Sequence, residues 1–459
     1  MIRKRLLIFV GAWIVVIAFL FLFRREETRP AKTAAALSVE RAPEDSKPGA
    51  EQTSPSDSSK PNITTLPATK GETPASAFGE RFHTEELTEL NEFLALVDLE
   101  RVTHRALKSG SWSDPAVWGG EVPDEGSRAH IPEGIAVTLK DIDTDHLKSL
   151  RVDGDLELAP TENVDLKVDT LVVNESGTLS VGSAQAPIPG DKEALITIQA
   201  FDDPNDDEAA RRNSARMIAL GEVSLHGESK TSMALLSQAP RSGDRVIVLE
   251  AAPANWREGD VIVLGGARQS RDELESLQVE YVRGNRVGLT PIEKGDETPR
   301  WPGLADDYTP NRDQLAFAVN VSRNVGISSP SLDAETAGEY PRGSMTLSGE
   351  GASQSEFIGV AVYGLGVNDA ILEGQDVSVN RPAVEVLGGG AARIVGMALV
   401  DAPESGVKFD GDSVRITDSV AYDENGGGWL TTSGSASRLV WSHSRTTSGA
   451  VLGMGGSVP

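Results

Sequence analysis

Residues 108–123 of this 459-residue chain read Lys108-Ser-Gly-Ser-Trp-Ser-Asp-Pro-Ala-Val-Trp-Gly-Gly-Glu-Val-Pro123. Two tryptophans, Trp112 and Trp118, stand here among glycines, with Asp114-Pro115 between them. Glycine adopts positive φ at no steric cost, and Asp-Pro favours the start of a turn. The stretch therefore predicts a tight turn followed by short strands.

The stretch resembles the opening of the eight-glycine (G8) domain of proteins of the cell-surface and secreted hyaluronidase (cell-migration-inducing) type and of the fibrocystin type. The glycine pattern continues in order through Ile131-Pro-Glu-Gly134, Leu150-Arg-Val-Asp-Gly154, Gly177-Thr-Leu-Ser-Val-Gly182 and Ala186-Pro-Ile-Pro-Gly190. The resemblance implies an all-β G8 domain over residues 105–230 and a location outside the cytoplasm.

Composition excludes several classes of function. The chain has 43 Lys and Arg against 69 Asp and Glu, a formal charge of −26, which argues against nucleic-acid binding through bulk charge. It contains no cysteine, so disulfides and cysteine-ligated metals are excluded. Abundant glycine and few aromatic residues are typical of a protein built from strands and turns.

The N-terminus carries a membrane signal. Basic residues precede and follow an uncharged run at residues 6–23, which is long enough to span a bilayer. We expect residues 1–25 to be a signal anchor with a cytoplasmic N-terminus, which makes a single-pass cell-membrane protein whose bulk is extracytoplasmic, periplasmic or on the cell surface. A cleaved signal peptide is the alternative. Residues 26–83, rich in Pro, Ser and Thr, predict a disordered stalk.

The remaining chain is predicted in four parts: a short helix at 84–104, the G8 domain at 105–230, a small β-insert at 231–295 and a short right-handed parallel β-helix at 310–459. The β-helix rests on a repeat. Ile371, Ile394, Ile416 and Leu439 are spaced by 23, 22 and 23 residues, and Val384, Val407, Trp429 and Val451 by 23, 22 and 22. A period near 22 made of short strands predicts one coil of a β-helix per repeat.

The resemblance also implies histidines at three places in the β-helix, and this chain lacks them. The corresponding positions carry Ser344, Glu385 and Gly427. The six histidines of the chain show no metal-ligand spacing, so no metal and no cofactor is expected. Catalysis of the family type is therefore not favoured.

Carboxylates remain as weak catalytic candidates, because a pair of them suffices for glycoside hydrolysis. Asp401, Asp423 and Glu424 occur in turns after corresponding strands; the alternative is that Asp and Asn there only stabilise solenoid corners. Ligand-groove candidates occur in the same repeats. Arg393 and Arg415 recur in phase with Arg438, and we call these three the arginine ladder. The ladder either neutralises the acidic residues of the turns or holds an anionic sugar. The other two groove candidates are Asn380 and Trp429.

Two functions follow as expectations. The first is a membrane-anchored protein that binds an extracellular polysaccharide or serves as a surface scaffold, without catalysis. The alternative is a hyaluronidase-like enzyme that uses carboxylates. The last coil has no evident cap, which predicts a protein partner, self-association at the C-terminal end of the β-helix, or a truncated chain.

Overall fold

The structure is a computed structural model. It describes residues 94–140, 143–159, 161–238, 244–265, 275–291, 317–330, 341–348, 354–371, 378–387, 392–402, 406–410, 415–422, 430–432 and 438–441. The predicted membrane span at 6–23 and the stalk at 26–83 lie outside these ranges. Within the described ranges, no helix is both long and apolar enough to cross a membrane.

The helix predicted at 84–104 is shorter in the part that the structure describes. Residues 94–96 are helical, and the 3-10 helix η1 follows at Leu99–Arg101. The Asp98 side chain accepts a hydrogen bond from the Glu100 amide and so caps η1. The first strand, β1, already begins at His104.

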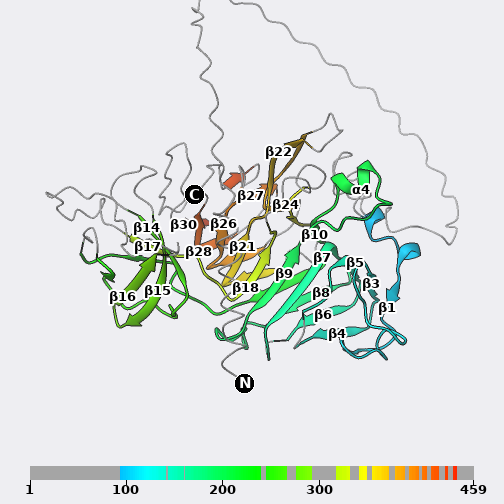
Figure 1. Cartoon of the computed structure of the whole chain (residues 1–459), viewed down its shortest axis with the longest axis horizontal. Coiled ribbons are helices and arrows are strands. Elements are labelled where there is room, and N and C mark those ends of the chain that lie inside the picture. Colours follow the sequence, from blue (N-terminus) through cyan, green and yellow to red (C-terminus); the bar gives the residue numbers. More distant parts are fainter. Residues whose placement is uncertain are drawn as a thin grey trace, which may run out of the picture. The chain divides into compact units, whose positions relative to one another are not determined.

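Three stacks of parallel strands form a solenoid (Figure 1). Stack 1 contains β1 (His104–Arg105), β3 (Arg128–Ile131), β5 (Leu147–Val152), the end of β7 (Val164–Val173), β10 (Arg216–Ala219), β19 (Ser344–Leu347), β24 (Val384–Leu387), β27 (Val407–Asp410) and β29 (Leu430–Thr432). Stack 2 contains β2 (Gly110–Ser111), β4 (Ala136–Leu139), β6 (Asp155–Leu158), β8 (Thr178–Val181), β11 (Glu222–His226), β20 (Glu356–Ile358), β25 (Arg393–Val395), the start of β28 (Arg415–Tyr422) and β30 (Arg438–Trp441). Stack 3 contains the start of β7, β9 (Ala194–Ile198), β18 (Val325–Ser328), β21 (Val360–Tyr363), β26 (Ala398–Val400) and the end of β28.

The G8 region and the β-helix form one solenoid instead of two consecutive domains. β10 pairs with β7 before it and with β19 after it, and β9 pairs with β18 across the insert. The parallel stacks therefore begin at β1, whereas the sequence placed the β-helix at 310–459. Sequence periodicity missed this because the early coils differ in length.

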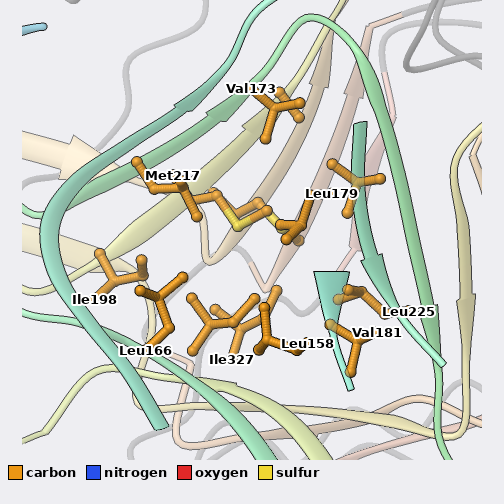
Figure 2. Close-up of a cluster of buried hydrophobic side chains, with 14 of the residues drawn as sticks. Leu158, Leu166, Val173, Leu179, Val181, Ile198, Met217, Leu225 and Ile327 are labelled. Atoms are coloured by element: carbon orange, nitrogen blue, oxygen red, sulfur yellow. The ribbon is translucent and has the colours of Figure 1, made fainter. Parts of the chain in front are cut away.

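The core lies between the three stacks. Leu158, Val181 and Leu225 from stack 2 point toward Met217 from stack 1 and Ile327 from stack 3 (Figure 2). All five side chains are fully buried. Burial of each such side chain contributes roughly 1.5–3 kcal/mol, so the core stabilises every coil against its neighbours.

Signature glycines Gly134, Gly154 and Gly177 occupy corners between stack 1 and stack 2. A Cβ on Gly154 would lie 2.3 Å from the Ile135 carbonyl oxygen, and one on Gly177 would lie 2.2 Å from that of Val152. Gly221 continues the column with the same 2.2 Å approach, to Asn174. Each corner thus packs directly on the backbone of the preceding coil.

The insert is a small antiparallel barrel. Its six strands are β12 (Met233–Leu235), β13 (Val246–Val248), β14 (Val261–Gly265), β15 (Glu275–Arg283), β16 (Arg286–Pro291) and β17 (Phe317–Asn320). In the sheet they lie in the order β12-β17-β14-β15-β16-β13. A bridge between Leu236 and Leu249 joins the two outer strands, with Ser237 donating to the Val248 carbonyl at 2.8 Å. The insert therefore reaches residue 320, beyond the predicted boundary at 295, because β17 closes a sheet that begins far earlier in the chain.

The barrel packs on the outward side of stack 3. Val263 and Val319 of the barrel form an apolar cluster with Ala361 and Ala398 of the solenoid. Arg323 fixes the junction: its guanidinium donates to the carbonyl oxygens of Asn320, Ser322 and Gly396 and to Ser232 Oγ. Burial lowers the pKa of Arg323 to about 10, so the guanidinium stays charged at neutral pH.

Two further segments leave the solenoid where stack 3 passes to stack 1. One contains the helix α4 (Glu208–Arg212), and the other is the antiparallel hairpin of β22 (Val367–Ile371) and β23 (Ser378–Arg381). Arg381 donates to the carbonyl oxygens of Arg212 and Ser214, which ties the hairpin to the segment around α4.

Candidate functional site

The outward sides of stacks 1 and 3 are covered in part. In stack 1, Val172 and Ile218 alternate with core residues and so point outward, yet both are buried. The segment before α4 lies against this stack, where Lys148 Nζ contacts Asp206 Oδ2 at 2.5 Å and Asp169 Oδ2 at 2.8 Å. In stack 3 the barrel covers the later coils, whereas the Lys167 side chain in β7 keeps 40% of its surface exposed.

Stack 2 carries polar residues on its outward side. Its outward residues in the early coils include Glu157, which is exposed, and Thr138, Ser180 and Ser224, which are partly exposed. These side chains alternate with buried core residues such as Leu156 and Leu158 in the same strands. In these coils the outward face of stack 2 therefore meets solvent.

The strand register of stack 2 aligns one residue per coil, and from Thr138 to Arg393 the side chain of this residue lies on the outward face. We call this the stack-2 row: Ser111, Thr138, Glu157, Ser180, Ser224, Glu356, Arg393, Arg415 and Arg438. Neighbouring members are about 4.8 Å apart because that is the spacing of paired strands.

Glu356 joins two basic groups in this row. Its Oε1 accepts from Arg393 Nη1 at 3.1 Å, and its Oε2 contacts His226 Nε2 at 3.1 Å. His226 is buried, and its Nδ1 lies 3.4 Å from Ser224 Oγ. The Arg393 side chain keeps 49% of its surface exposed and that of Glu356 keeps 32%, so their ion pair contributes about 0–1 kcal/mol and is easily exchanged.

The residues predicted from sequence separate into different parts of the fold. Arg393 and Arg415 occupy adjacent positions of the stack-2 row, as their phase indicated. Asn380 lies in β23 of the hairpin. Asp423, Glu424 and Trp429 lie outside the described residues.

Asp401 does not lie on stack 2, where Arg393 and Arg415 are. It follows β26 at the edge between stack 3 and stack 1, with φ of 55°, and its carboxylate accepts from Arg342 Nη2 at 2.8 Å. The arginines at positions 393, 415 and 438 were expected to neutralise the turn carboxylates, but Asp401 is paired with Arg342 instead. Arg393 pairs with Glu356 instead, because sheet pairing brings Glu356 into the same row.

Ser224, His226 and Glu356 were missed by sequence reasoning. His226 and Glu356 are 130 residues apart in the chain, with the whole barrel between them. No local spacing signals such a pair.

The two tryptophans of the opening turn are structural. Trp112 and Trp118 are buried, with ring centroids 4.9 Å apart in an edge-to-face arrangement. Trp118 Nε1 donates to the Trp112 carbonyl oxygen at 2.8 Å. Buried rings offer no stacking platform to a ligand, so this turn stabilises the first coil.

Two of the three positions at which the resemblance implies histidine lie on stack 1. Ser344 is buried in β19, and Glu385 of β24 is paired with Lys408 Nζ at 2.7 Å. Gly427 lies outside the described residues. In the described ranges, no group of three or more His, Asp or Glu is arranged to hold a metal ion.

Comparison with known proteins identifies one domain. Residues 117–237 match the G8 domain family. Human fibrocystin-L is 26% identical over 185 residues, which cover 39% of this chain and 4% of that protein. Mouse fibrocystin is 27% identical over 183 residues, with the same coverage. The match therefore spans a small fraction of the length of these relatives.

Two solved structures are similar at much lower levels. The tailspike gp61 of Pseudomonas phage phi297 is 12% identical, with a TM-score of 0.16, covering 59% of this chain and 43% of that one. The Gp54 tailspike of Acinetobacter baumannii bacteriophage AP22, solved with a capsular saccharide, is 11% identical, with a TM-score of 0.17, covering 61% and 43%. These scores carry no conclusion about this chain. The glycine-lined corners and the family match agree: this chain contains a G8 domain similar to those of the fibrocystins, within its first solenoid coils.

Proposed function

We propose that this chain is a membrane-anchored extracytoplasmic protein whose solenoid binds a polysaccharide on the outward face of stack 2 without cleaving it. Residues 6–23 would supply the anchor and residues 26–83 the stalk. The observation that carries the proposal is the stack-2 row, which presents an outward line of polar side chains, one per coil, from Thr138 to Arg393.

The geometry suits a linear polymer. Ser and Thr hydroxyls both donate and accept hydrogen bonds, so a row of them can pair with successive sugar hydroxyls. The repeat of about 4.8 Å runs along the solenoid axis, and an extended chain lying parallel to that axis meets the same chemistry at every coil. A scaffold without a glycan ligand would need no such row.

Hydrolysis by carboxylates is the alternative. A glycosidase needs two carboxyl groups that flank the scissile bond, one of them able to give up a proton. Asp401 is held by Arg342 at the edge between stacks 3 and 1, which favours a structural role for it. Asp423 and Glu424, the other two candidates, remain predictions.

A glycan-array screen of the full chain in detergent tests the proposal, with product analysis on each glycan bound. We expect binding without release of shorter sugars. Ser180→Tyr, which places a bulky ring in the stack-2 row, should weaken binding at least about tenfold, because one or two hydrogen bonds are lost.

Lys167→Tyr serves as the matched control, since Lys167 is outward and partly exposed on stack 3. Failure to bind any glycan would refute the proposal. Release of oligosaccharides would instead favour the enzymatic alternative.

A further inference from the structure

We infer that Ser224, His226 and Glu356 form a hydrolytic site, which removes acyl groups esterified to the hydroxyls of the bound polysaccharide. Ser224 is the nucleophile, His226 is the general base, and Glu356 positions His226. The inference rests on the proposed function, because the ester is carried by the polymer that lies along the stack-2 row. Removal of acyl groups leaves the polymer chain itself uncut.

The sheet brings the three side chains together on the outward face of stack 2. Ser224 and His226 are two residues apart in β11, so their side chains leave the strand on the same side. Glu356 stands opposite Ser224 on the neighbouring strand β20, and its Oε2 reaches His226 Nε2 at 3.1 Å. Two adjacent strands therefore supply a hydroxyl, an imidazole and a carboxylate in contact.

The contacts of the imidazole assign its tautomer. An ionised carboxylate only accepts hydrogen bonds, so in the neutral ring of His226 the proton is on Nε2, which faces Glu356. Nδ1 is then the unprotonated nitrogen, and it lies 3.4 Å from Ser224 Oγ. Such contacts are often long in the free enzyme and tighten when substrate binds. The hydroxyl proton of Ser224 can therefore pass to Nδ1.

The base is enclosed and the nucleophile is accessible. The His226 side chain is 4% exposed, and its main-chain carbonyl oxygen accepts from the Ile188 amide at 2.9 Å. Glu356 is oriented in turn by Arg393 Nη1, 3.1 Å from Oε1. Ser224 is partly exposed. A nucleophile beside a base that a third group orients is the arrangement required for nucleophilic catalysis.

The reaction needs only water besides the ester. Ser224 Oγ attacks the carbonyl carbon of the acyl group while its proton moves to His226 Nδ1. The bond from that carbon to the sugar oxygen then breaks, and the sugar oxygen takes the proton and leaves as a hydroxyl group. Water gives a proton to the same nitrogen, attacks the acyl-serine and releases a carboxylic acid, and the proton returns to Oγ.

Ser180 offers a donor to the carbonyl oxygen of the ester. It stands opposite Ser224 in the preceding coil, is partly exposed, and is about 4.8 Å away at the spacing of paired strands. Negative charge develops on the carbonyl oxygen during the attack, and a hydroxyl that donates to this oxygen lowers the barrier. The stack-2 row thus supplies both the nucleophile and a stabilising donor.

The test uses the full chain in detergent and two kinds of probe. A fluorophosphonate, which reacts with activated serine hydroxyls, tests the nucleophile without any glycan. Chemically O-acetylated forms of each glycan bound on the array test the substrate. We expect mass spectrometry to find the label on Ser224, and we expect release of acetate without shorter sugars.

Substitutions separate the roles of the three residues. Ser224→Ala, which removes one partly exposed hydroxyl, should lower acetate release at least about 1,000-fold and abolish the label. Glu356→Gln should lower kcat about 100-fold or more with KM unchanged and slow the labelling, because the tautomer of His226 is no longer fixed. Glu356→Asp keeps the carboxylate and should retain part of the rate.

Ser328→Ala, which removes a partly exposed outward hydroxyl on stack 3, is the matched control and should change nothing. Thermal unfolding of each variant verifies folding. If Glu356 were only structural, its substitution would alter the unfolding temperature and leave the labelling rate unchanged.

The outcomes separate the two proposals. An unlabelled Ser224, or acetate release that persists in Ser224→Ala, would overturn this inference and leave glycan binding intact. Absence of binding to every glycan of the array would refute the proposed function, and with it the polysaccharide substrate, even if Ser224 takes the label.

Discussion

At the scale of single residues, the glycine signature records close backbone contacts between coils. Gly154, Gly177 and Gly221 each sit where a Cβ would collide with a carbonyl oxygen of the preceding coil. Gly134 belongs to the same signature for a different reason: its φ is 77°, and nothing lies within 4 Å of the Cβ position. The signature thus combines a steric requirement with a conformational one.

Alanine substitutions distinguish these two requirements. Gly154→Ala should lower the free energy of unfolding by about 3 kcal/mol, because two coils must move apart. Gly134→Ala should cost only about 1–2 kcal/mol, the penalty of a left-handed backbone conformation. Chemical denaturation measures both values. Equal losses at the two sites would contradict the steric account.

At the scale of elements, the corner between stack 2 and stack 3 repeats a left-handed residue. Gly359 has φ of 63° and Gly396 of 67°, and the next coil carries Asp418 at 50°. The amide of Gly359 donates to Val395 and that of Gly396 to Thr417, so the corners stack on one another. Aspartate is one of the few other residues that tolerate this conformation.

Replacing Asp418 at this corner by glycine should therefore stabilise the solenoid. Asp418→Gly is expected to raise the free energy of unfolding by up to about 1 kcal/mol, since the strain at positive φ is removed. Gly396→Ala, where the added Cβ meets no atom closer than 3.8 Å, should lower it by a similar amount. A destabilised Asp418→Gly variant in thermal or denaturant unfolding would show that the Asp418 side chain has a further role.

Coil periodicity predicted part of the strand register. Ile394, Ile416 and Leu439 are aligned in stack 2, as their spacing indicated. Ile371 lies in the β22–β23 hairpin, and Phe357 takes the place opposite Ile394. The hairpin lengthens that coil, so a constant step of 22 or 23 residues fails there.

The second register was off by one residue at its third member. Val384 pairs with Val407 as expected, but Leu430, and not Trp429, stands opposite Val407. Val451 lies outside the described residues. A one-residue error reverses the face on which a side chain lies, because strand side chains alternate.

At the scale of the whole molecule, Arg323 connects the barrel to the solenoid. It is buried and donates to oxygens on both sides of the junction, including Gly396 of the solenoid. The Tyr363 hydroxyl also donates across it, to the Val321 carbonyl oxygen at 2.8 Å.

Loss of this arginine should loosen the junction specifically. In Arg323→Met, the carbonyl oxygens of Asn320 and Gly396 lose their donor, and each unsatisfied buried group costs about 1–3 kcal/mol. Hydrogen exchange should accelerate in β17 and β26 and stay unchanged in β4 and β6. Arg283→Met, at an exposed site, serves as the control. Unchanged protection of β17 would show that apolar packing alone holds the barrel.

The sequence by itself determined the all-β architecture, the G8 domain, the coil spacing and the phase of Arg393 and Arg415, because glycine corners and strand alternation act over neighbouring residues. Only the tertiary structure decided that the G8 coils and the β-helix are one solenoid, that the insert closes into a barrel, and that Glu356 lies between His226 and Arg393. These features depend on contacts between residues far apart in the chain. Their partners are chosen by stacking and packing, which no local pattern of residue types encodes.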